Sequence, residues 1–131
     1  PQLAVFVSEA SRAFSMPANA NLYVTEHGQD VAISPHNDKQ DTLVLQLAGC
    51  KQWEFFKPTH PLPISNGNVK GKAGASKFTT GELNERLLQV RMSPRDVIYV
   101  PRGMVHATST KRSNCDSNST VSISFTLGLE T

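Results

Sequence analysis

The chain has 131 residues and a mass of 14.3 kDa, enough for one domain with a buried core. Its 38% hydrophobic and 18% charged residues are typical of a globular protein, and a net charge of +2 gives no reason to expect nucleic acid or a membrane surface as a partner. No segment approaches the roughly 18 consecutive apolar residues of a membrane span. Because the chain starts at Pro1 and not at methionine, we expect residues 1–131 to be a single domain from a longer protein.

The start of the chain predicts a helix, because apolar residues recur at helical spacing from Leu3 to Phe14 and Pro17 follows directly after them. Residues 57–80, rich in proline, glycine and asparagine, predict a long loop whose middle, residues 66–74, we expect to be mobile. Elsewhere short strands are predicted, at 21–26, 31–34, 42–47, 51–56, 86–92, 97–100, 104–108 and 120–127. About eight strands with little helix favour an all-β sandwich or barrel, of which the jelly roll is one form.

The two cysteines predict little structure. Cys50 and Cys115 lie far apart and form no CxxC pattern, so the sequence supports neither a disulfide framework nor a structural zinc site. We expect two separate reduced thiols, which are typical of an intracellular protein.

His36, Asp38 and His106 are candidate metal ligands. His36 and Asp38 are two residues apart in an extended segment, so both side chains point to the same side. His106 follows an apolar strand and a bend, from which it can point into the mouth of a barrel. Two imidazoles and one carboxylate are the ligand set of non-haem iron(II) sites with open coordination positions.

Other interpretations of these histidines remain open. A His-x-Asp triplet arises often by chance in polar loops, and a single histidine in a β protein is commonly structural. Asp41 competes with Asp38 as the carboxylate. His27 and His60 fall in loop-like stretches without a partner at ligand spacing, and we expect both to be surface residues.

Lys51 shares one face of its predicted strand with Trp53 and Phe55, which indicates an inward-facing position. A desolvated ammonium requires an anion, and that face of the strand carries no carboxylate. A bound carboxylate would provide one, such as the distal carboxylate of 2-oxoglutarate in an iron(II) oxygenase. Alternatively, Lys51 extends to solvent from the start of the strand.

The last predicted strand alternates hydroxyl and apolar side chains. Hydroxyls facing a barrel interior leave room for a small molecule and bind it through hydrogen bonds. The alternative is the solvent-facing side of an edge strand. The hydroxyl residues are Thr120, Ser122, Ser124 and Thr126.

The chain resembles the JmjC/cupin oxygenases, and within them the ribosomal-oxygenase (cupin-4) branch, over nearly its whole length. The most specific segment is Tyr-Val-Pro-Arg-Gly-x-x-His at 99–106, and the others are residues 21–25, 35–38 and 43–53. The chain departs from this family by a longer loop at 66–74, by Asn37 in place of a frequent aromatic residue, and by Ser122 in place of a frequent histidine.

The resemblance implies a double-stranded β-helix (jelly roll) that uses Fe(II), 2-oxoglutarate and O₂. It implies iron ligands at His36, Asp38 and His106, and it implies that Lys51 binds the tail of 2-oxoglutarate. Three further residues, Asn21, Tyr23 and Thr126, match positions that line the site.

The implied activity is hydroxylation of a protein side chain, with a histidine or arginine of a ribosomal protein favoured. The alternatives are a JmjC histone lysine demethylase, a non-catalytic cupin-type binding domain, and another metal-dependent cupin enzyme such as an isomerase. The resemblance also implies that relatives dimerise, through regions absent from residues 1–131. The resemblance implies the nucleus or nucleolus for a eukaryotic protein, and the cytoplasm otherwise.

Overall fold

The computed structural model describes residues 2–62, 65–72, 74–112, 115 and 118–130. Helix α1 (Gln2–Phe14) is followed by eight strands, with two short 3₁₀ helices, η1 (Asn66–Asn68) and η2 (Thr80–Glu82), between the fourth and fifth strands. Among the described residues, no helix is long and apolar enough to cross a membrane. The strands are β1 (Ala18–Glu26), β2 (Ile33–His36), β3 (Asp41–Ala48), β4 (Lys51–Phe56), β5 (Arg86–Met92), β6 (Val97–Val100), β7 (Val105–Ser109) and β8 (Val121–Leu129).

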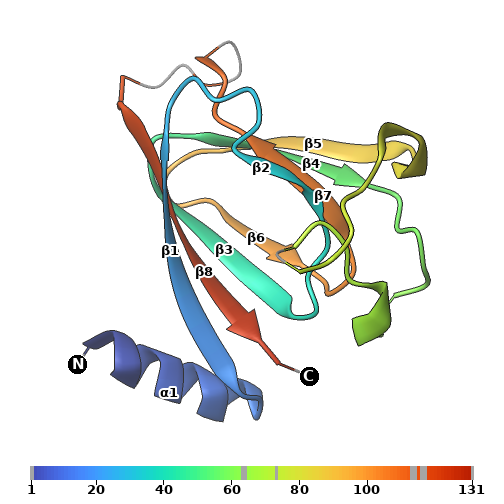
Figure 1. Ribbon diagram of the computed structural model, residues 1–131. Coiled ribbons are helices and arrows are strands. Elements are labelled where there is room, and N and C mark those ends of the chain that lie inside the picture. The colour runs from blue at the N-terminus through green and yellow to red at the C-terminus, as the bar shows by residue number, and fades with distance from the viewer. Residues whose placement is uncertain (1, 63–64, 73, 113–114, 116–117, 131) are drawn as a thin grey trace.

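The strands form two four-stranded antiparallel sheets, β1-β8-β3-β6 and β2-β7-β4-β5, which face each other (Figure 1). The predicted helix and the all-β jelly-roll architecture are confirmed. The second strand lies two residues later than the pattern predicts, so His36 is its last residue. This placement matters because the strand itself fixes the direction of the His36 side chain.

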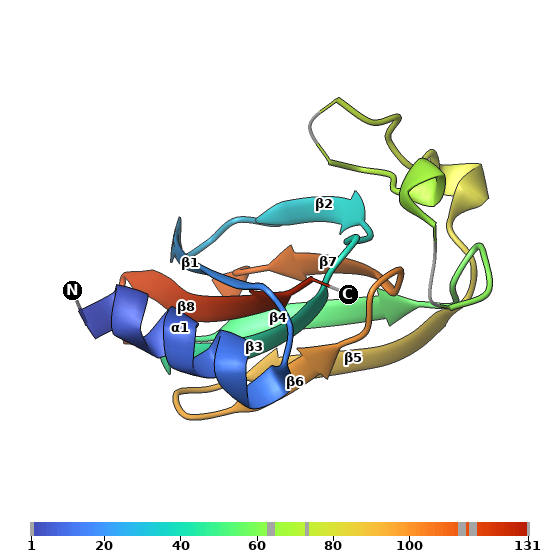
Figure 2. The ribbon, with the colours of Figure 1, turned by 90° about the horizontal axis from the view of Figure 1, so that it is seen from below.

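Helix α1 packs on the outer face of the β1-β8-β3-β6 sheet (Figure 2). Ala10 is buried against Leu127 and Leu129, and the rings of Phe6 and Phe125 meet edge to face with centroids 5.5 Å apart. These apolar residues of β8 therefore pack against the helix and do not fill the space between the two sheets.

This arrangement decides the orientation of the hydroxyl residues. Ser122, Ser124 and Thr126 are buried on the inner face of β8, which lies between β1 and β3 and is not an edge strand. Thr120 lies just before the strand and is exposed. The side-chain NH₂ of Gln46 on β3 donates to Ser122 Oγ at 2.9 Å, so the inner hydroxyl of Ser122 has a partner inside the molecule.

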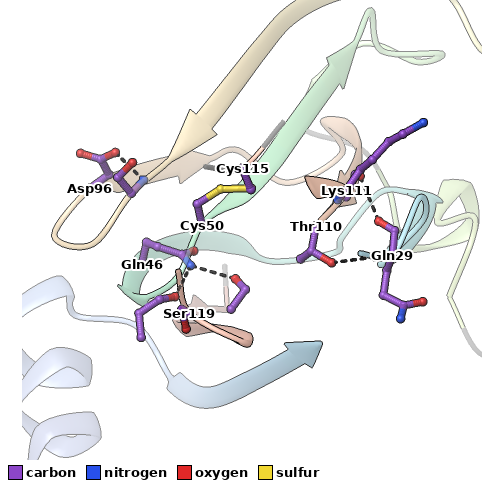
Figure 3. Close-up of a disulfide and its surroundings, with 12 residues drawn as sticks. Gln29, Gln46, Cys50, Asp96, Thr110, Lys111, Cys115 and Ser119 are labelled. Carbon is purple, nitrogen blue, oxygen red and sulfur yellow. Dashed lines mark hydrogen bonds between the residues drawn. A yellow bond between two sulfur atoms is a disulfide. The ribbon is translucent and has the colours of Figure 1, made fainter. Parts of the chain in front are cut away.

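The expectation of separate thiols is wrong, because Cys50 and Cys115 form a disulfide (Figure 3). Their Cα atoms are 5.7 Å apart, within the usual range for a disulfide. The bond links Cys50, the residue just before β4, to the connection between β7 and β8. Sequence spacing gave no indication of this pairing, since the folding of the sheets brings two residues 65 positions apart together. Because the two cysteines are joined, they give no reason to expect an intracellular compartment.

Removing the disulfide is expected to destabilise the protein. Cys115→Ser should lower the free energy of unfolding by about 4 kcal/mol, because a long loop is no longer closed in the unfolded chain. Urea denaturation of the wild type and the variant measures the difference. Reduced wild-type protein should behave like the variant, and equal stability of the oxidised wild type and the variant would contradict the bond's role.

Candidate metal centre

Two buried histidines face each other across neighbouring strands. His36 on β2 and His106 on β7 are direct partners in the antiparallel register. Their ring centroids are 4.2 Å apart, and both rings are almost completely buried. Directly paired residues of antiparallel strands point to the same face of a sheet, so both imidazoles point to the interior.

Backbone carbonyls fix the tautomer of both rings. His36 Nδ1 lies 2.8 Å from the carbonyl oxygen of Ser34, and His106 Nδ1 lies 2.9 Å from that of Met104. A carbonyl oxygen only accepts hydrogen bonds, so each Nδ1 donates its proton. Each Nε2 therefore has a free lone pair, which is the arrangement that metal-binding histidines use.

Asp38 completes the cluster from the segment just after β2. Its Oδ2 atom lies 3.7 Å from His36 Nε2 and 3.5 Å from His106 Nε2. One ligand atom from each of the three residues lies within 4.8 Å of the others. The competing carboxylate, Asp41, instead accepts a hydrogen bond from the backbone N–H of Arg102 at 2.8 Å. The donor set fits a divalent metal with open positions, such as non-haem iron(II).

Burial keeps both imidazoles neutral. It lowers the pKa of His106 to about 4, with the nearby His36 as a second cause. Burial also lowers the pKa of His36. Neutral imidazole is the form that binds metals, so the site is ready to accept an ion at neutral pH.

The stability of the metal-free protein is expected to fall as the pH drops from 6.5 toward 4. In this range the unfolded chain binds a proton at residue 106, whereas the folded protein does not. The resulting loss for this residue is about 2 kcal/mol between pH 7 and pH 5. Urea denaturation in the presence of a chelator measures it. The His106→Asn variant should show a smaller pH dependence, whereas His60→Asn should not, and equal slopes in all three proteins would contradict the argument.

Lys51 lies at the start of β4 and is only 1% exposed, which excludes the solvent-facing alternative. Its ammonium donates a hydrogen bond to Thr25 Oγ1 at 3.2 Å and lies 6.0 Å from the ring centroid of Tyr23. Burial lowers its pKa. No carboxylate in the described part of the chain pairs with this ammonium, so the protein holds a buried cation that needs an anion.

A cavity of about 390 Å³ connects the metal ligands with Lys51. The inner hydroxyls of Ser124 and Thr126 face it from β8, and Trp53 lines it from β4. Asn21 and Tyr23, which the sequence also predicts to be near the site, line it from β1. The full set of lining residues is Asn19, Asn21, Tyr23, Thr25, Ala32, Ile33, His36, Asp38, Gln40, Thr42, Lys51, Trp53, Lys72, His106, Ser124, Thr126 and Gly128.

Some residues differ from the sequence expectations. His27 is buried and not a surface residue, and its ring lies against Gly49. His60 is half-buried in its loop. The sequence also gave no reason to place Lys72 at the site, where its ammonium pairs with Asp38. A lysine in a glycine-rich loop has no pattern that indicates an inward position.

The fold and the cluster together define a jelly-roll protein with a candidate metal site of two histidines and one aspartate. A family model described as "JmjC domain" matches residues 5–128. The chain therefore belongs to the JmjC domain family.

Curated relatives support this membership. The chain is 33% identical over 101 residues to ribosomal oxygenase 1 of Gallus gallus, covering 77% of this chain and 16% of the relative. It is 28% identical over 123 residues to the bifunctional lysine-specific demethylase and histidyl-hydroxylase NO66 of Drosophila willistoni, covering 94% of this chain and 15% of the relative. The chain thus spans less than a fifth of the length of these two proteins.

Solved structures share the fold. YcfD of Escherichia coli matches with a TM-score of 0.59 and 14% identity over 95% of this chain and 30% of its own. Its complex with cobalt and 2-oxoglutarate matches with a TM-score of 0.55 and 14% identity, over 95% and 28%. A cupin superfamily protein of Desulfitobacterium hafniense gives a TM-score of 0.51 and 17% identity, over 87% and 68%.

Proposed function

We propose that this chain is the catalytic core of an Fe(II)- and 2-oxoglutarate-dependent oxygenase that hydroxylates a protein side chain. The observation that carries the proposal is the convergence of three ligand atoms beside a buried ammonium. His36, Asp38 and His106 provide the atoms, and Lys51 provides the ammonium. Two relatives whose names describe an oxygenase or a hydroxylase support it.

The ligand residues would hold the metal on one side. His36 Nε2, His106 Nε2 and Asp38 Oδ2 would each bind one position, and the cavity would leave the remaining positions open to small molecules. Bound iron(II) with 2-oxoglutarate and O₂ supplies the oxidising chemistry. The carbonyls of Ser34 and Met104 orient the two imidazoles for this role.

Lys51 would bind the distal carboxylate of 2-oxoglutarate. An ammonium that is buried and, within the described part of the chain, hydrogen-bonded to the hydroxyl of Thr25 alone gains a charged partner when a carboxylate enters. The hydroxyls of Ser124 and Thr126 face the same cavity and are able to donate to that carboxylate. Trp53, which belongs with Phe55 to the hydrophobic core, lines the same cavity.

The proposed substrate is a ribosomal protein, because the relatives include one named ribosomal oxygenase 1. Histidine and arginine are the side chains that we consider first. Demethylation of a methyl-lysine is the second candidate, because a relative carries both a demethylase and a histidyl-hydroxylase in its name.

Turnover of the cosubstrate tests the proposal. The protein, supplied with iron(II), ascorbate and 2-oxoglutarate in air, should form succinate even without a protein substrate. Metal binding without any succinate, with or without ribosomal proteins present, would favour a non-catalytic binding domain. An isomerase or another metal-dependent enzyme would remain active after Lys51→Ala, whereas the proposed oxygenase would lose affinity for 2-oxoglutarate.

A further inference from the structure

The loop at residues 68–72 is attached to the segment that carries the metal ligands. Asn37, which is completely buried, accepts a hydrogen bond from the backbone N–H of Lys70 at 2.7 Å. Its side-chain amide donates to the carbonyl of Asn68 at 3.3 Å, and its own N–H donates to the carbonyl of Lys70 at 3.1 Å. Asn37, which lies between His36 and Asp38 in the chain, therefore attaches this loop to the segment that carries both ligands.

Gly71 brings the loop backbone into direct contact with the site. Its φ of +78° lies in the left-handed region, and a Cβ atom there would lie 2.4 Å from the carbonyl oxygen of Pro35 and 2.6 Å from His36 Cβ. The Gly71 N–H donates to the carbonyl of Ser76 at 2.8 Å. The next residue, Lys72, lines the cavity.

The ammonium of Lys72 binds the oxygen of Asp38 that the metal site does not need. Lys72 Nζ lies 2.5 Å from Asp38 Oδ1. The other oxygen, Oδ2, is the one that faces Nε2 of both histidines. Since the two oxygens have separate partners, ligation of a metal through Oδ2 leaves the Lys72 ion pair in place.

The cavity therefore has an excess of positive charge. Lys51 and Lys72 are its cations, and Asp38 is its single carboxylate among the described residues that line it. The amide side chains of Asn19, Asn21 and Gln40 also line it and add no charge. The charge of a divalent metal and the charges of the two carboxylates of 2-oxoglutarate cancel each other. The negative charge of Asp38 then balances the positive charge of only one of the two lysines.

We propose that Lys72 is a specificity-determining residue, which makes the cavity select neutral or acidic substrate side chains and reject guanidinium and methylated ammonium groups. The selection among substrate side chains rests on the proposed function. The positive potential at the cavity does not depend on it. A cationic side chain that reaches the metal comes near the Lys72 ammonium, because that ammonium is paired with the ligand residue Asp38, and like charges repel. Arginine and methyl-lysine thereby become disfavoured targets.

Charged fluorescence quenchers test the potential without metal or turnover. Trp53 is the chain's only tryptophan and lines the cavity, so its emission reports on this site. With quenching by neutral acrylamide as the reference, iodide should quench Trp53 more efficiently than caesium does. Lys72→Glu should lower the iodide-to-caesium ratio by roughly threefold, and Lys72→Met by less. Lys77→Glu is the control, because Lys77 is an exposed lysine five residues further along the chain that does not line the cavity. Equal ratios in all four proteins would overturn the proposal.

A peptide library tests the selection itself. After incubation with iron(II) and 2-oxoglutarate, mass spectrometry identifies the peptides that gained one oxygen. Wild-type protein and Lys77→Glu should modify neutral or acidic residues at least about tenfold more often than arginine or methyl-lysine, and Lys72→Glu should lose this preference. Succinate formation without a preference, or the same preference in Lys72→Glu, would overturn the proposal. If no succinate forms at all, the proposed function fails, and the quenching ratio alone decides the role of Lys72.

Discussion

Replacing His106 with alanine is expected to weaken binding of a divalent metal by more than about 100-fold and to abolish succinate formation. The substitution removes one of three ligand atoms that lie within 4.8 Å of one another. It also removes the ring against which the imidazole of His36 packs. Titration calorimetry with cobalt(II) measures the affinity, and succinate formation with iron(II) measures the activity.

The matched control for this substitution is His60→Ala. His60 lies half-buried in the loop after β4, where its Nδ1 is 3.1 Å from the hydroxyl of Thr59. It should leave metal affinity and activity within about twofold of the wild type. A thermal melt of each variant establishes that it is folded. If folded His106→Ala bound cobalt(II) as tightly as the wild type, His106 would not be a ligand.

Replacing Lys51 with methionine is expected to raise the KM for 2-oxoglutarate by about 30-fold or more. The substitution keeps most of the apolar stem and removes the buried ammonium, which donates a hydrogen bond to the Thr25 hydroxyl. Metal affinity should change little, because Lys51 is not part of the ligand cluster. Steady-state kinetics with iron(II) at varied 2-oxoglutarate concentrations provide the test.

The stability of the same variant is a second measurement, and there no loss is expected. Because an uncompensated buried cation is costly, Lys51→Met should be at least as stable as the wild type when no cosubstrate is present. Lys57→Met, at an exposed position just after β4, should change neither quantity. Unchanged KM in Lys51→Met, or a large loss of stability in the cosubstrate-free protein, would mean that Lys51 has a structural role and does not bind the cosubstrate.

The local patterns of the sequence predicted much of the fold. The alternation of hydroxyl and apolar residues in β8 predicted a strand, and helical spacing predicted α1. The pattern alone did not show which face of β8 points inward. The structure shows that the apolar face packs under α1, so the hydroxyls of Ser124 and Thr126 face the cavity. Which face is inside depends on the packing of the helix, which lies far away in the sequence.

The candidate site was partly predictable for a similar reason. His36 and Asp38 are neighbours in the sequence, and the period of an extended chain puts them on one side. Lys51 was placed by the aromatic residues that share its face. The Cys50–Cys115 disulfide and the Lys72–Asp38 ion pair depend on how distant segments meet, and no local period carries that information.

A crystal structure with manganese(II) and 2-oxoglutarate tests the central claim most directly. The account predicts one anomalous peak bound by His36 Nε2, Asp38 Oδ2 and His106 Nε2, with the distal carboxylate of 2-oxoglutarate hydrogen-bonded to the Lys51 ammonium. A manganese ion bound elsewhere would contradict the account. So would a 2-oxoglutarate molecule that leaves Lys51 without a carboxylate partner.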